Sequence, residues 1–184
     1  MGPVSVQDMN QQVRDVLDLL MNPPGCRRAG KISFGKDAGT WAVLALEPPG
    51  QGAGREHSYD TTGTAMSNSL IRVTAPRDGL YKVTAGAVIG SYQTGGKIGY
   101  ARVAVAKGIT EGAQFEPAAF LKFGCHRIWD SHRSGTGTAT VPLRAGEWIA
   151  LAGFAEGAAW MFSDDKETAG AATFLEMQWV GEYP

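Results

Sequence analysis

Hydrophobic positions near the start of the chain recur at the spacing of an α-helix. Between residues 5 and 22 they are separated alternately by three and four positions, and polar residues occupy the opposite side. This stripe consists of Val6, Met9, Val13, Val16 and Leu20. Ser5 can cap the first turn, with Asp8 in the capping-box position, and the Pro-Pro-Gly of residues 23–25 ends the helix. The pattern predicts one short amphipathic helix.

A helix of this length is marginal in water by itself, so its apolar stripe must be buried against something. Three alternatives are open. The helix packs on its own domain, forms a short parallel bundle with copies of itself, or docks into another protein. The regular three–four spacing favours the bundle more than is usual for so short a helix. We therefore assign residues 1–25 as a trimerisation or anchoring segment.

From residue 28 onward the hydrophobic pattern changes to alternation with a period of two, which is typical of half-buried strands. The candidate strands are residues 30–35, 40–46, 69–75, 80–89, 97–106, 118–123, 136–142, 147–154 and 172–181. Gly, Pro, Asn and Asp stand at most boundaries between them, and no second helix of normal length fits. So many strands without crossover helices predict an antiparallel sandwich or barrel at residues 26–184. The stretch 47–67 is too long for a structureless loop, so we expect an ordered surface excursion or a contact site there.

The composition excludes several classes of function. The 184 residues suit one domain with an appendage, and the 25 glycines are scattered, which implies many tight turns. With 17 basic and 18 acidic side chains, no positive surplus exists to neutralise phosphates, so nucleic-acid binding is not expected. The longest apolar run, residues 41–46, is far too short to span a membrane. No basic segment followed by an apolar run opens the sequence, so we expect no signal peptide and synthesis in the cytoplasm.

The residues that could carry chemistry form no convincing site. Two cysteines, Cys26 and Cys125, are too few for a disulfide framework, and we expect two free thiols. Strand alternation would place Cys125 and His126 on opposite faces, which argues against a shared metal ion. The acidic residues 164–167 leave calcium open, although a solvated loop tip is the usual interpretation. With no nucleophile elbow and no ordered catalytic triad, we expect neither enzymatic activity nor a cofactor.

Several aromatic residues fall in or beside predicted loops rather than in strand centres. They are Tyr92, Trp129, Trp160 and Phe162. Aromatic rings near loop carboxylates and amides are used in carbohydrate and protein contacts, so these four are candidate surface-binding residues. The alternative is that they cap the ends of the sandwich or line an oligomer axis.

Three segments carry a resemblance to a known family. Ile71–Val83 comprises a strand, a Pro-x-Asp-Gly turn and a strand that opens with an inward tyrosine. Val141–Leu151 joins two late strands through a leucine, a turn glycine and an acidic residue, and Ala172–Gly181 is a closing strand. In order and spacing, roughly residues 30–182 resemble the complement-q and tumour-necrosis-factor superfamily. The resemblance implies a homotrimeric jelly roll, with small-residue strands such as 103–106 and 150–153 packed around a three-fold axis.

The opening of the chain adds a second resemblance. Residues 4–10, the helix and residues 22–27 are similar to small virion proteins of tailed phages of actinobacteria, which carry a knob of this superfamily. This implies a virion structural protein whose helix binds other virion proteins. It would be a minor tail or fibre-tip protein contacting a glycan or protein of the host envelope. The alternative is a capsid decoration protein at three-fold positions. Host contact predicts a hydrophobic or aromatic patch on the distal loops, whereas decoration predicts contacts concentrated at one end, around the helix.

Overall fold

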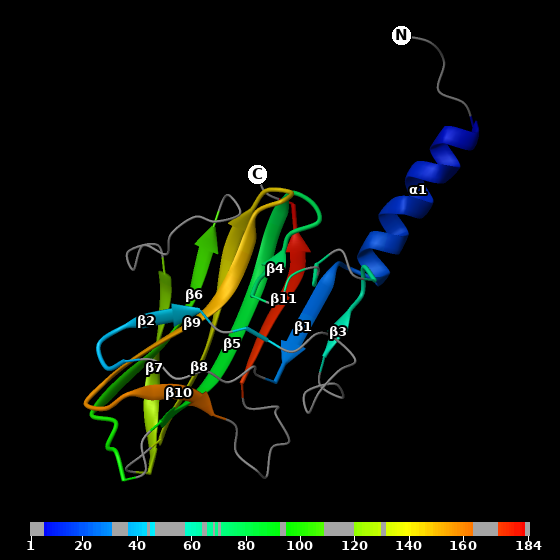
Figure 1. The fold of residues 1–184 in the computed structure, drawn as a ribbon. Coiled ribbons are helices and arrows are strands. Elements are labelled where there is room, and N and C mark those ends of the chain that lie inside the picture. The colour runs from blue at the N-terminus through cyan, green and yellow to red at the C-terminus, as the bar shows by residue number, and fades with distance from the viewer. Residues whose placement is uncertain are drawn as a thin grey trace.

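The computed structural model shows a short helix followed by an all-β domain (Figure 1). It describes residues 6–30, 37–43, 45–46, 58–63, 66–67, 69, 71–92, 95–108, 120–129, 132–163 and 173–182. The elements are α1 (Val6–Met21), β1 (Gly25–Ala29), β2 (Trp41–Val43), β3 (Tyr59–Asp60), β4 (Val73–Thr74), β5 (Gly79–Ser91), β6 (Tyr100–Gly108), β7 (Phe120–Trp129), β8 (His132–Leu143), β9 (Trp148–Glu156), β10 (Trp160–Ser163) and β11 (Phe174–Gly181). The predicted fold class is confirmed.

The strands form two antiparallel sheets joined through β7. One sheet has the order β7-β8-β5-β11-β1-β3, with β10 also paired to β5. The other has the order β2-β9-β6-β7, with β4 also paired to β9. From β5 to β11 the chain passes repeatedly from one sheet to the other, which is the winding of a jelly roll.

The core lies between the sheets and follows the alternation seen in the sequence. In β5 the odd-numbered residues from Tyr81 to Ile89 are buried in the core, while Lys82 points outward and is exposed. In β11, Leu175 and Met177 enter the same core. The inward tyrosine expected at the start of β5 is confirmed, and the Tyr81 hydroxyl donates to the Arg77 carbonyl at 2.8 Å.

Two of the segments behind the family resemblance lie side by side in the fold. The backbone N–H of Ala145 donates to the Asp78 carboxylate at 2.7 Å, and that of Gly146 donates to the Ala75 carbonyl at 2.9 Å. Gly146 has a φ of +83°, a left-handed conformation in which an L side chain would be strained. The turn before β5 and the turn before β9 therefore stabilise each other.

Some predicted boundaries are corrected. The first strand, β1, lies at residues 25–29, and the predicted strand 30–35 falls outside the described residues after Gly30. The boundary assigned between residues 25 and 26 therefore falls inside β1. Strands β3 and β10 were not predicted: β3 has only two residues, and β10 follows a turn at Gly157. Tertiary pairing with β1 and β5 makes these segments extended.

Of the excursion expected between residues 47 and 67, the structure describes residues 58–63, 66 and 67, where β3 joins the sheet and Met66 is buried in the core. The Asp60 carboxylate accepts hydrogen bonds from the N–H groups of Thr62 and Ser67, both at 2.9 Å, and so holds these two positions beside β3. The chain on either side is held by Arg28, which is fully buried and donates to the carbonyls of Leu46, at 2.6 Å, and Ser69. Burial lowers the pKa of this guanidinium, and the carbonyl partners compensate part of its desolvation.

Helix α1 leaves the domain at the edge formed by β1 and β3 and projects away from it (Figure 1). The residues that join the helix to β1 are hydrogen-bonded to neighbouring segments. The Pro24 carbonyl accepts from the N–H of Trp179 at 2.8 Å, and the Thr61 hydroxyl accepts from the N–H of Gly25 at 2.8 Å. No helix among the described residues is long and apolar enough to cross a membrane.

Candidate functional site: assembly and contact surfaces

One outer face of the sandwich, formed by β8, β5, β11 and β1, presents small and polar side chains. Core and outward residues alternate along each strand, and the strand register aligns the outward ones in rows. We call this the assembly face and define it by Arg27, Lys82, Thr84, Gly86, Thr136, Thr138, Thr140, Phe174, Glu176 and Gln178. One row runs across all four strands through Arg27, Glu176, Thr84 and Thr138.

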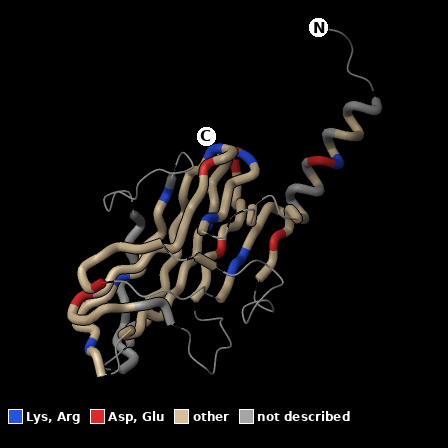
Figure 2. Tube along the Cα trace, in the orientation of Figure 1, with Lys and Arg blue, Asp and Glu red and all other residues tan. Residues whose placement is uncertain are grey.

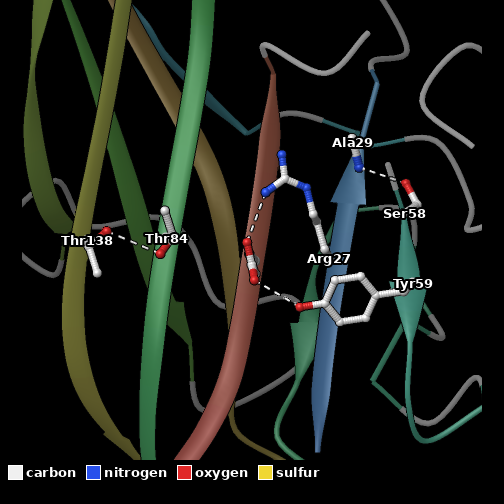
Figure 3. Close-up of polar contacts among 7 residues, drawn as sticks. Arg27, Ala29, Ser58, Tyr59, Thr84 and Thr138 are labelled. Carbon is white, nitrogen blue, oxygen red and sulfur yellow. Dashed lines mark hydrogen bonds and ion pairs between the residues drawn. The ribbon is translucent and has the colours of Figure 1, made fainter. Parts of the chain in front are cut away.

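The polar groups of this row are paired with each other (Figure 3). Arg27 Nη1 lies 2.9 Å from Glu176 Oε2, and the Tyr59 hydroxyl donates to Glu176 Oε1 at 2.9 Å. The hydroxyls of Thr84 and Thr138 lie 3.2 Å apart. Burial, followed by the bond to Glu176, raises the pKa of Tyr59 to about 12, so the phenol stays a donor at neutral pH. The row presents no uncompensated charge.

Phe174 lies against the sheet in the same face because its neighbour is a glycine. A Cβ built on Gly86 would stand 2.6 Å from Phe174 Cε1, so only glycine leaves room for the ring. The Arg27 guanidinium lies 3.9 Å from the centroid of that ring, in a cation–π contact. The result is a low surface on which another β-sheet can approach closely.

The predicted position of the oligomer surface in small-residue strands is corrected. Ala104 and Ala106 of β6 and Ala152 of β9 are fully or almost fully buried in a single chain. The partly buried side chains of Trp41 and Val43 pack against them. These alanines therefore form a second small core, on the outer side of the β2-β9-β6 sheet, and leave no surface for a three-fold axis.

Of the predicted apolar stripe of α1, the side chains of Met9 and Val13 are described, and they are 56% and 59% exposed. Leu17 and Met21, which lie outside the stripe, are 52% and 77% exposed. The side chains of Val6, Val16 and Leu20 lie outside the described residues. Arg14 and Asp15 lie at exposed positions on the helix. Figure 2 shows that charges of both signs are interspersed over the described part of the sandwich. For Met9 and Val13, packing on the chain's own domain is therefore excluded.

The aromatic residues predicted to bind at the surface have different positions. Tyr92 is 62% exposed, as expected for such a residue. For Trp160 the prediction is wrong, because β10 pairs with β5 and directs this indole into the core, where it is 0% exposed. The backbones of Trp129 and Phe162 belong to β7 and β10, and their side chains lie outside the described ones.

A different group of aromatic residues does meet at the surface. Trp41 and Phe154 have ring centroids 5.3 Å apart, and Tyr100 meets Phe154 edge-on at 6.5 Å. The Arg102 guanidinium lies 4.9 Å from the centroid of Tyr100, and its Nε donates to the Tyr100 hydroxyl. We call Trp41, Tyr100, Arg102 and Phe154 the aromatic cluster. Alternation alone places Tyr100 and Arg102 on one face of β6, so this part of the cluster was accessible from the sequence.

The buried titratable groups of the described residues include the Tyr81 phenol, the Arg28 guanidinium and the Cys26 thiol. Cys26 carries a free, buried thiol, as predicted, and burial followed by the charge of Asp60 raises its pKa to about 12. Such a thiol is unreactive at neutral pH. The state of Cys125 remains a prediction, because its side chain is not described. Among the described side chains, no three His, Cys, Asp or Glu residues are grouped to hold a metal ion.

Comparisons with known proteins define the class by its fold. Neither a protein-family model nor a curated protein sequence matches the chain. Among solved structures, murine APRIL at pH 5.0 is 12% identical over 85% of this chain and 98% of its own, with a TM-score of 0.54. Eiger TNF from S. frugiperda is 13% identical over 87% of this chain and 94% of its own, with a TM-score of 0.50. The chain therefore has a jelly-roll fold of tumour-necrosis-factor type, and this likeness extends to the fold alone.

Proposed function

We propose that this chain is a non-enzymatic assembly and attachment module. Three β domains associate through the assembly face, and the three N-terminal helices fasten the trimer to a larger particle. The particle is a phage virion, in line with the resemblance of residues 4–10 and 22–27 to small virion proteins. The observation that carries the proposal is a contrast between the two outer faces: the small side chains of the β2-β9-β6 sheet are buried within the chain, whereas those of the assembly face are left uncovered.

The assembly face supports self-association on physical grounds. Burying a charge is costly unless it is already paired, and Arg27 and Glu176 are paired before any partner arrives. The threonine side chains are short, and Gly86 lets Phe174 lie low, so two such surfaces can come into close contact. Val180 adds apolar area on the same side of β11, where it is half-exposed.

The helix supports attachment. Burying each side chain of its stripe contributes about 1.5–3 kcal/mol as an upper estimate, and the described members are unburied in the single chain. Within the virion, the position of the aromatic cluster favours a minor tail or fibre-tip protein that contacts the host. The cluster lies on β2, β6 and β9, far from the helix-bearing edge (Figure 1). The exposed stripe at the helix end also fits the alternative, a capsid decoration protein at three-fold positions.

Light scattering tests the assembly, and its expected result is a mass three times that of the 19.5-kDa chain. Thr138→Glu would place an extra carboxylate in the assembly face of every copy and should produce folded monomers. Thr40→Glu, at an exposed position outside this face, is the matched control and should remain trimeric. A monomeric wild-type chain at micromolar concentration would refute the proposal.

Antibody labelling of intact particles in the electron microscope tests attachment and location. Labelling at the tail or its tip supports the host-contacting role, and labelling over the shell supports decoration. Val13→Asp in the helix stripe should abolish incorporation, whereas Gln11→Asp, at another exposed position of the helix, should preserve it. Normal incorporation of the Val13 variant would exclude attachment by the helix.

A further inference from the structure

The aromatic cluster is built by three neighbouring strands and is open to solvent. Phe154 of β9 pairs with Trp41 of β2 on one side and with Arg102 of β6 on the other, so β9 lies between β2 and β6 at this point. Tyr100 is 42% exposed, and the other three side chains are partly exposed. The four side chains therefore form one continuous patch on the outer side of the β2-β9-β6 sheet.

The loops beside this patch are held by backbone hydrogen bonds. The N–H of Gly39 donates to the Ala155 carbonyl at 2.8 Å, and the N–H of Gly99 donates to the Glu156 carbonyl at 3.0 Å. Gly157 lets the chain approach closely, because a Cβ there would stand 2.8 Å from the Lys97 carbonyl oxygen. Both segments are thus fixed against the end of β9, and the patch is pre-organised for binding.

The patch is also accessible in the proposed trimer. It belongs to the sheet opposite the assembly face, and it lies on the far side of the domain from α1 (Figure 1). Three copies joined through the assembly face would therefore present three such patches outward, away from the particle that holds the helices.

The composition of the patch points to an uncharged partner. Among the residues that the structure describes, the exposed or half-exposed charges of the patch balance, with Lys97 and Arg102 against Asp37 and Glu156. Such a rim offers donors and acceptors for hydroxyl groups but no net field for a polyanion or polycation. This composition disfavours nucleic acid and anionic polymers.

The size and shape of the patch favour a carbohydrate over a protein. Three partly buried rings supply well below the roughly 800 Å² per partner that a standard protein interface buries. The ring planes of Trp41 and Phe154 differ by 38°, and those of Tyr100 and Phe154 by 72°. A flat ligand could stack on only one of them, whereas successive sugar rings of an oligosaccharide can turn to meet each.

We propose that the aromatic cluster is a binding site for a neutral glycan chain, with sugar rings packed on Tyr100, Trp41 and Phe154 and hydroxyl groups bound by Arg102. This inference rests on the proposed host-contacting role and names the partner. Repetition of the site in the trimer would convert weak single contacts into avid attachment to a polysaccharide surface.

An array of neutral and anionic oligosaccharides, probed with the full-length protein, tests the inference. Binding to a subset of neutral glycans is expected. Tyr100→Ala and Arg102→Ala should each weaken it by about tenfold or more. Ile71→Ala is the matched control, because Ile71 is also exposed but precedes β4, which pairs with the opposite end of β9, and binding should be unchanged.

Three results would overturn the inference: no binding to neutral glycans, binding to anionic glycans only, or unchanged binding by Tyr100→Ala. Envelope fragments of the host distinguish a protein partner, because protease treatment should leave glycan-mediated binding intact. Light scattering and particle incorporation read out the proposed function separately. If they succeed while the array fails, the glycan site alone is excluded.

Discussion

The two outer faces of the sandwich differ in whether their small side chains are covered by other parts of the same chain. On the β2-β9-β6 sheet, alanines are covered by Trp41 and Val43, and the aromatic cluster continues from this covered area. On the β8-β5-β11-β1 sheet, polar groups pair along the surface, and Phe174 and Val180 are its bulky apolar side chains. Burial within one chain covers the alanines of the first face and leaves the aromatic cluster beside them exposed, while internal pairing prepares the second face for a partner without covering it.

The largest expected effect comes from placing the same charge on each face. Ala152→Glu puts a carboxylate beneath Trp41 and Val43, where it has neither space nor a partner. We expect it to destabilise the chain by about 3 kcal/mol or more. Thr138→Glu, at an exposed position, should change the stability of the single chain by only about 0.5 kcal/mol. Urea denaturation of dilute samples measures the free energy of unfolding of both variants. Similar losses of stability in the two would contradict the distinction between the faces.

Sequence periodicity predicted the strands that build both faces. The alternation is clearest in β11 and the first half of β5, where every second residue enters one core, whereas β6 and β9 are buried on both faces. The three–four spacing of the apolar stripe likewise predicted helix α1. Strand β1 was misplaced because it carries Arg27 and Arg28 directly after a Pro-Pro-Gly break. Arg28 is buried only because carbonyls 18 and 41 positions away accept its hydrogen bonds, and no local pattern contains that information.

The surfaces themselves were harder to predict. Thr136, Thr138 and Thr140 look in sequence like an ordinary solvent-facing row of a strand. Only the register with β5 and β11 shows that they continue into the paired row of Glu176 and Arg27. The aromatic cluster combines three strands that are distant in the chain. The error for Trp160 has the same cause, because pairing with β5 overrode a loop-like local sequence.

The junction of helix and sandwich should respond to alkaline pH. The thiol of Cys26 has a pKa of about 12 in the folded chain against 9.0 as a free group, because burial and the charge of Asp60 oppose ionisation. The unfolded chain therefore loses this proton first as the pH rises, and stability present below pH 9 is lost progressively toward pH 12. We expect a loss of about 2 kcal/mol near pH 10.5 as an upper estimate.

Urea midpoints between pH 8 and pH 11 measure this loss. Cys26→Ala should flatten the profile but not abolish the slope, since burial also raises the pKa of Tyr81 to about 12. Iodoacetamide gives a second readout: the native Cys26 thiol should stay unmodified at pH 8 and react on unfolding. Rapid labelling of Cys26 in the native protein would contradict the buried position of β1.

The smallest expected effect concerns the open face alone. Tyr59→Phe removes the hydroxyl that donates to Glu176 but leaves the ion pair between Glu176 and Arg27 in place. Because Tyr59 is 40% exposed, water can replace the lost bond in the single chain, and we expect a cost below about 1 kcal/mol there. In the trimer that water would be excluded from the assembly face. Dissociation on dilution, followed by light scattering, should therefore reveal the substitution more clearly than urea denaturation does.

Tyr92→Phe, at an exposed position outside the assembly face, is the control and should change neither the stability of the chain nor the dissociation of the trimer. An equal response of chain stability and trimer dissociation to Tyr59→Phe would show that the row of paired polar groups stabilises the sheet itself and has no part in assembly.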